Sequence, residues 1–249
     1  MQGIYALSVG KWAVAGITAI MVGISKTGLP ALGILLAPLF AEALPARAST
    51  GALLPLLIAG DAFAVVFWRR HGSWKHLLRL FPPALVGIVA GYFAMGRVND
   101  QQLRYIMGAI VIVMLGVMVY REYILGTDKP LPTTWWFASI AGFLAGATTM
   151  VANAGGPVTM IYLISMRLPK KEFIGTAAWY FFVLNWVKVP FSLSLGLITG
   201  PSLLFDSVLV AGVIGGAFAG LALAHRIPEK AFMIAVQGLT LVSAVRMFF

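Results

Sequence analysis

One pattern of leucine, proline and glycine residues occurs twice in this chain, at a constant separation of 124 residues. The first copy consists of Leu44, Pro45, Gly51, Gly72, Gly91 and Gly96, and the second of Leu168, Pro169, Gly175, Gly196, Gly215 and Gly220. Because the chain has 249 residues, this offset divides it into two nearly equal halves. We therefore predict two repeats, residues 1–125 and residues 126–249.

The composition indicates that each repeat is a block of membrane-spanning helices. Hydrophobic residues make up 60% of the chain and charged residues 10%, and the mean hydropathy is +0.93. A water-soluble globule of this size cannot bury so much apolar surface. We predict an all-α polytopic membrane protein, surrounded by the lipid bilayer and without a soluble domain.

The net charge of +10 would suggest a nucleic-acid partner in a soluble protein. Here the lysines and arginines lie between apolar segments, where they set the orientation in the membrane, so no nucleic-acid partner is expected. The absence of cysteine excludes disulfides and thiolate metal sites, and the three histidines are scattered. We therefore expect neither a cofactor nor a metal site.

Two of the apolar segments, 30–41 and 157–166, are too short to cross a bilayer. As helices they would measure about 15 to 18 Å, against a hydrocarbon core of about 30 Å. The full set of apolar segments is 4–24, 30–41, 48–68, 77–96, 103–120, 134–152, 157–166, 173–195, 202–225 and 230–249. We predict that each repeat contains one broken or re-entrant half-helix pair and three spanning helices.

A chain break precedes each short segment. The first break is Gly28-Leu29-Pro30, and the second runs from Asn153 to Pro157. Proline suits the first turn of a helix, and irregular backbone at membrane depth needs protein or a wet cavity to satisfy its polar groups. The alternative is a simple kink in each helix, but two breaks at corresponding positions favour half-helices.

The basic residues predict opposite orientations for the two repeats. The positive-inside rule places eleven of them in the cytoplasm: Arg69, Arg70, Lys75, Arg79, Arg121, Lys129, Arg167, Lys170, Lys171, Arg226 and Lys230. The other face receives four, namely Arg47, Arg97, Arg104 and Arg246. The loop at Pro45 then lies outside and its copy at Pro169 inside. Inverted repeats of this kind place broken helices around a substrate site near the bilayer midplane.

Four polar side chains fall inside apolar segments: Lys26, Asp61, Asn185 and Lys188. A charge at the membrane centre costs about 2.5 to 3.5 kcal/mol, so such residues face a partner or a pathway. Asp61 and Asn185 are 124 residues apart and thus share one repeat position. Asp61 is a candidate proton carrier, or else a structural partner of one of the lysines. Asn185 is a substrate ligand or a packing hydrogen bond, and Lys188 is a secondary candidate that snorkelling to the interface would also explain.

The two breaks together suggest a site for an anion. The first break offers Ser25, Lys26, Thr27 and Gly28, and the second offers Thr148, Thr149, Asn153, Gly155 and Gly156. Free backbone N–H groups at the start of each half-helix would add to the positive potential. Neither break contains an acidic residue, so we expect a small anionic substrate rather than a cation.

These segments resemble the TauE/SafE sulfite exporter family. The resemblance lies in GISKTGLPALGILLAPLF, followed by LPARASTGALLPLLIAGD, and in their echo AGATTMVANAGGPVTMIYLISMRLPKKEFIGTAAWYFFVLN. It implies a carrier of a bacterial-type inner membrane for sulfite, an organosulfonate or a related organic anion. It also implies that the anion binds at the breaks from Gly23 to Pro30 and from Thr148 to Pro157.

We therefore interpret the chain as a secondary transporter, and not as an enzyme, that moves a small anion by alternating access. Coupling to H⁺ through Asp61 would drive transport. An anion channel is the nearest alternative, and a non-transporting scaffold is another. The residues predict no particular oligomeric state.

Overall fold

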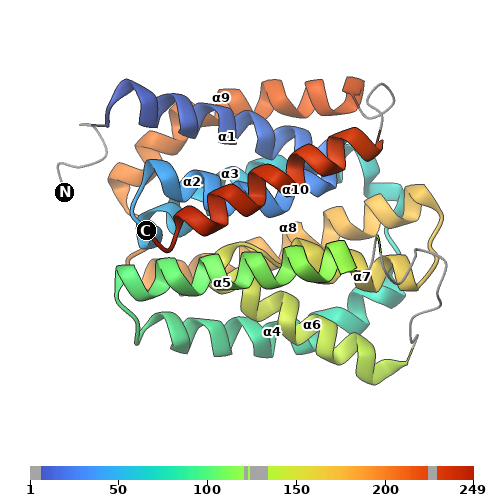
Figure 1. Ribbon diagram of the computed structural model, residues 1–249. Coiled ribbons are helices and arrows are strands. Elements are labelled where there is room, and N and C mark those ends of the chain that lie inside the picture. The colour runs from blue at the N-terminus through green and yellow to red at the C-terminus, as the bar shows by residue number, and fades with distance from the viewer. Residues whose placement is uncertain (1–6, 121–122, 124–133, 224–228) are drawn as a thin grey trace.

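A computed structural model describes residues 7–120, 123, 134–223 and 229–249 (Figure 1). Each of the ten apolar segments contains one α-helix. The helices are α1 (Val9–Thr27), α2 (Gly33–Ala43), α3 (Ala46–Trp68), α4 (Trp74–Met95), α5 (Asp100–Val119), α6 (Trp135–Ala152), α7 (Gly156–Ser165), α8 (Lys170–Ser194), α9 (Gly200–Leu223) and α10 (Glu229–Arg246), with short 3-10 turns η1 (Pro30–Leu32) and η2 (Arg69–His71). The described part of the chain is all-helical, as predicted.

Six segments are long and apolar enough to cross a membrane. They are Val9–Thr27, Ala46–His71, Trp74–Met95, Asp100–Val119, Trp135–Ala152 and Gly200–Leu223. Helix α8 also has 25 residues, but it carries four charged side chains, at Lys170, Lys171, Glu172 and Lys188. Shorter apolar helices occupy Pro30–Ala43, Gly156–Ser165 and Ile234–Arg246. These lengths are those of a multi-pass membrane protein.

The order of helix lengths is the same in both halves. A long helix is followed by a short one and then by three further helices, α1 to α5 in the first half and α6 to α10 in the second. The short helices α2 and α7 have 11 and 10 residues. The predicted boundary between residues 125 and 126 lies outside the described residues.

Each short helix folds back along the long helix before it. Trp12, near the start of α1, and Phe40, near the end of α2, both contact Phe205, with ring centroids 4.8 and 6.4 Å apart. In the second half, Phe137 at the start of α6 lies 6.2 Å from Tyr162 near the end of α7. Both pairs therefore form hairpins whose two ends lie on the same side.

Helices α3 and α8 cross in opposite directions. Gly51 near the start of α3 packs against Leu197, just after α8. Asp61 meets Asn185 further along, and the Ser73 N–H after α3 donates to Thr176 Oγ1 near the start of α8 at 2.9 Å. Residue numbers at the contacts fall along α8 as they rise along α3, so the two helices run antiparallel. Their crossing brings together Asp61 and Asn185, which occupy one repeat position.

Close glycine contacts join helices of the two halves. Helix α1 lies along α9, where a Cβ on Gly216 would clash with the Ile20 carbonyl oxygen, and α4 lies along α6, where one on Gly146 would clash with that of Ala84. Backbones that approach this closely gain dispersion contacts that larger residues would prevent. The two halves are thus packed into each other (Figure 1).

One end of the α3/α8 crossing is rich in exposed basic side chains. Arg69, Arg70 and Lys75 follow α3, and Lys171 begins α8 beside them. We call this end the basic side, and the sequence predicts that it faces the cytoplasm. Arg121, Lys129 and Arg226, which the same count placed there, lie outside the described residues.

Replacing Gly216 by alanine should destabilise the protein, since the new methyl group would separate α1 from α9. We expect a loss of about 1 to 3 kcal/mol, which is typical of overpacked cores. The measurement is the thermal unfolding midpoint in detergent.

The control is Gly215→Ala at the adjacent position, where nothing lies within 4 Å of an added Cβ. Equal midpoints for the two variants would contradict the importance of this contact.

Candidate functional site

An ion pair lies where the first long helix ends. Lys26, in the last turn of α1, places its Nζ 2.7 Å from Asp61 Oδ1 on α3. The Lys26 side chain is 14% exposed and the Asp61 side chain 1%. The carboxylate is therefore buried, while the lysine side chain remains partly accessible. The Lys26 ammonium also lies 4.6 Å from the centre of the Phe181 ring, a cation–π distance.

Asn185 and Lys188 extend this pair into a network on α8. Asn185 Nδ2 donates to Asp61 Oδ2 at 2.6 Å. Lys188 Nζ donates to Asn185 Oδ1 at 3.2 Å, to Asn153 Oδ1 at 2.6 Å and to Thr149 Oγ1 at 3.3 Å. A continuous line of polar contacts thus joins α1, α3, α8 and the end of α6.

Asn153 owes its position to the way α6 ends. It caps that helix in the left-handed region, with φ 51°, which asparagine tolerates better than most residues. Its Nδ2 donates to the Thr50 carbonyl oxygen at 3.2 Å, while its Oδ1 accepts from Lys188. One side chain therefore ties α6 to both α3 and α8.

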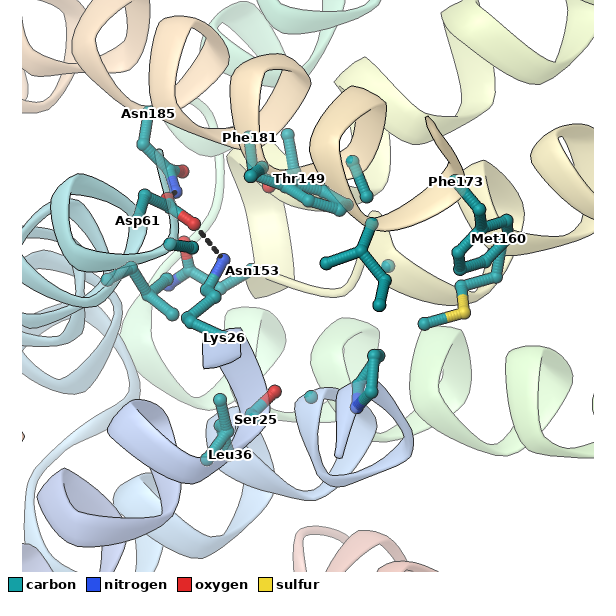
Figure 2. A pocket seen from close by; sticks show the side chains of 18 residues that line it. Ser25, Lys26, Leu36, Asp61, Thr149, Asn153, Met160, Phe173, Phe181 and Asn185 are labelled. Carbon is teal, nitrogen blue, oxygen red and sulfur yellow. Dashed lines mark hydrogen bonds and ion pairs between the residues drawn. The ribbon is translucent and has the colours of Figure 1, made fainter. Parts of the chain in front are cut away.

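A cavity adjoins this network (Figure 2). Its volume, as the space open to the centre of a water-sized sphere, is about 80 Å³. One water molecule needs about 10 to 15 Å³ by that measure, so several waters or one small ligand fit. The predicted site residues that line it are Ser25, Lys26, Asp61, Thr149, Asn153, Gly156 and Asn185.

Residues at the same position of the two halves of the chain line the cavity together. Four lining pairs are separated by 124 residues: Ser25 and Thr149, Leu36 and Met160, Leu57 and Phe181, and Asp61 and Asn185. Both halves of the chain therefore contribute to the cavity wall, at positions 124 residues apart. Figure 2 shows Phe173 and Met160 at the end away from Asp61 and Lys26, so one end is polar and the other apolar.

The network carries more positive than negative charge. Lys26 is paired with Asp61, whereas Lys188, 1% exposed, bonds to amide and hydroxyl oxygens. Among the described residues, no carboxylate lies within ion-pair distance of Lys188. A buried ammonium without a counter-charge is costly.

Five predicted residues do not line the cavity in this structure. Lys188 lies behind Thr149, Asn153 and Asn185. Thr27 and Thr148 direct their hydroxyls to backbone oxygens, of Ala217 at 2.7 Å and of Leu144 at 2.6 Å. Gly28 packs against Gly220, and Gly155 against Ala145. Thr27, Gly28 and Gly155 thus contact neighbouring helices, whereas the Thr148 hydroxyl bonds within α6.

The backbone N–H groups just after α1 and α6 bond back to the helix that each follows. Those of Gly28 and Leu29 donate to the Ile24 carbonyl oxygen at 2.9 and 3.0 Å. In the second break, those of Asn153 and Ala154 donate to Thr149 and Thr148.

Two features escaped the sequence analysis, one at the site and one outside its lining. The apolar lining residues Met160 and Phe181 were missed, although their 124-residue offset from Leu36 and Leu57 is a usable signal. Asp206 on α9 was also missed. It is 4% exposed, and neither of its carboxyl oxygens has a hydrogen-bond partner among the described residues.

The family model for the sulfite exporter TauE/SafE matches residues 12–247 of this chain. The chain belongs to the TauE/SafE family. No curated protein and no solved structure gave a match. The TauE/SafE match and the six candidate spans together make the protein a multi-pass membrane protein of a transporter family.

Removing either partner of the Lys26–Asp61 pair should destabilise the protein, since the other charge is left buried and unpaired. Lys26→Met and Asp61→Asn should each cost about 3 to 5 kcal/mol. The double variant should lose less than the sum of the two, as thermal unfolding of the four proteins in detergent would show. Strictly additive losses would contradict the coupling.

Proposed function

We propose that this protein is a secondary transporter that moves a small anion across a bacterial-type inner membrane by alternating access. The observation that carries the proposal is the cavity at the α3/α8 crossing, which equivalent residues of both halves line and which adjoins more ammonium groups than carboxylates. A site that two related halves share can be closed by either of them in turn.

The proposal includes an inverted relationship between the repeats. Its support is that α3 and α8, corresponding helices of the two halves, run antiparallel and cross at corresponding residues. The first and second hairpins, α1–α2 and α6–α7, then enter from opposite sides as re-entrant pairs. Broken helices that meet in this way are typical of transporter substrate sites.

The anion would bind between Ser25 and Thr149, beside the Lys26 ammonium. Lys26 donates to Asp61 and has further N–H groups available, because an ammonium carries three. Thr149 Oγ1 accepts from Lys188, which leaves its own proton free to donate into the cavity. These donors suit the oxygens of sulfite or an organosulfonate, the substrates that family membership favours.

Charge balance offers a role for a proton. Lys26, Lys188 and Asp61 together carry one net positive charge when all are ionised, which one monoanion neutralises. A dianion would leave a negative charge in a buried site unless Asp61 took up a proton, since such a site penalises net charge. We therefore propose Asp61 as the site at which H⁺ couples to the anion.

Replacing Lys188 by glutamine should reduce anion transport at least about tenfold, because the uncompensated charge contributes at least the ~1.4 kcal/mol that a tenfold change represents. Lys188→Arg keeps the charge and should retain more activity. The measurement is counterflow of labelled sulfite into proteoliposomes.

The control for that experiment is Lys11→Gln, at an exposed lysine near the start of α1. A folded Lys188→Gln protein that transports normally would contradict the role of Lys188. Anion current without counter-substrate would indicate a channel. A protein without transport, current or anion-dependent thermal shift would be a scaffold.

Asp61→Asn should separate exchange from proton-driven accumulation. Asparagine keeps the size of the side chain and one accepting oxygen but cannot carry a proton. We expect anion exchange to persist while a pH gradient no longer drives uphill uptake in proteoliposomes. Uphill uptake at the normal level would exclude Asp61 as the proton carrier.

A further inference from the structure

The cavity extends unevenly along the α3/α8 crossing. On α8 it reaches from Asn185 toward the basic side, along Phe181, Ala178, Ala177 and Phe173. The corresponding positions beyond Asp61 on α3 lie toward the opposite side and are closed. There Ser49 and Leu53 are each 1% exposed and Thr50 is 4% exposed.

Three contacts close the side opposite the basic one. A Cβ built on Gly51 would lie 2.9 Å from Leu197 Cβ. The Asn153 amide holds the Thr50 carbonyl oxygen. Arg47 Nη1 donates to the carbonyl oxygens of Met95 and Val98, at 2.9 and 3.1 Å, so the start of α3 is joined to the turn after α4.

A corresponding glycine contact lies on the basic side. Gly175 on α8 packs against His71 and Gly72, where an added Cβ would lie 2.8 Å from the His71 carbonyl carbon. Gly51 and Gly175 occupy one repeat position, and Gly72 and Gly196 another. Gly51 and Gly175 thus each make a close contact with the chain that follows the other helix, once at each end of the crossing.

We propose that these two glycine contacts are the gates of the transporter and that they open in alternation. The inference rests on the proposed transport function. Both contacts are closed in this structure. The basic-side gate opens when Gly175 parts from His71, and the opposite gate opens when Gly51 parts from Leu197. Ser49, Thr50 and Leu53 then line the cavity in place of Phe173, Ile174 and Ala177, their partners at the 124-residue offset.

The exchange also changes which lysine reaches the substrate. Lys188 occupies the repeat position of Ala64, which lines the cavity in this structure. When the second half adopts the arrangement that the first half has in this structure, Lys188 lines the cavity at the position corresponding to Ala64. The anion is then held near Lys26 when the cavity extends toward the basic side, and near Lys188 when it extends the other way.

The absence of cysteine from the chain makes a thiol-labelling test direct. Leu53→Cys and Ala177→Cys form a matched pair, since they share one repeat position. In sealed vesicles that are transporting anion, we expect a membrane-impermeant thiol reagent to modify Cys at 177 from the basic side and Cys at 53 from the opposite side. Leu77→Cys, at a fully buried position on α4, should stay unmodified and controls for unfolding.

Disulfide locks test the gates themselves. Gly51→Cys with Leu197→Cys, and Gly72→Cys with Gly175→Cys, place thiols across the two contacts. Oxidation of either pair should abolish counterflow, reduction should restore it, and the sulfite-dependent thermal shift should remain while the lock is closed.

The outcomes separate the two proposals. A cysteine-free protein that neither transports nor binds anion refutes the transport function. Transport that continues through a closed lock overturns the gates alone. The gates are also overturned if the Leu53→Cys protein transports but is not modified, while the Ala177→Cys protein reacts.

Discussion

The crossing of α3 and α8 at Asp61 and Asn185 is the interaction on which the rest of the structure depends. Each partner is costly alone at membrane depth: a carboxylate, an amide and two ammonium groups all need polar partners where no bulk water is present. The crossing satisfies them together, because Asp61 accepts from Lys26 and Asn185, and Lys188 donates to Asn185, Asn153 and Thr149. The hairpins that supply Lys26, Thr149 and Asn153 are thereby held against the crossing, and the cavity lies between them.

Glycine sets how closely the surrounding helices approach this centre. The α1/α9 and α4/α6 pairs pack backbone against backbone at Gly216 and Gly146, since lipid supplies no hydrophobic force to drive helices together. The same device at Gly51 and Gly175 closes the two ends of the crossing.

Site residues could be predicted where a polar side chain at membrane depth carries a high free-energy cost. They could not be predicted where helix packing alone decides which residues line the cavity. Lys26, Asp61, Asn185 and Lys188 stand out in apolar segments, and the structure joins all four. Thr27, Thr148, Gly28 and Gly155 lie in the same breaks but do not line the cavity, because helical rotation about each break decides which side chains point inward. Met160 and Phe181 went unnoticed since apolar residues in a membrane helix carry no local signal of what they face, and Asp206 shows that even a buried carboxyl can be overlooked in a long apolar segment.

The sequence by itself determined that this is an all-helical membrane protein, that its helix order repeats, and that two short helices follow chain breaks. Those properties follow from hydrophobicity, segment length and local backbone preferences, which act within one stretch of chain. Only the tertiary structure decided that Lys26 pairs with Asp61 while Lys188 lacks a carboxylate partner among the described residues, and that the cavity extends toward the basic side. These outcomes depend on distances between segments more than thirty residues apart, and such distances are set by how whole helices pack.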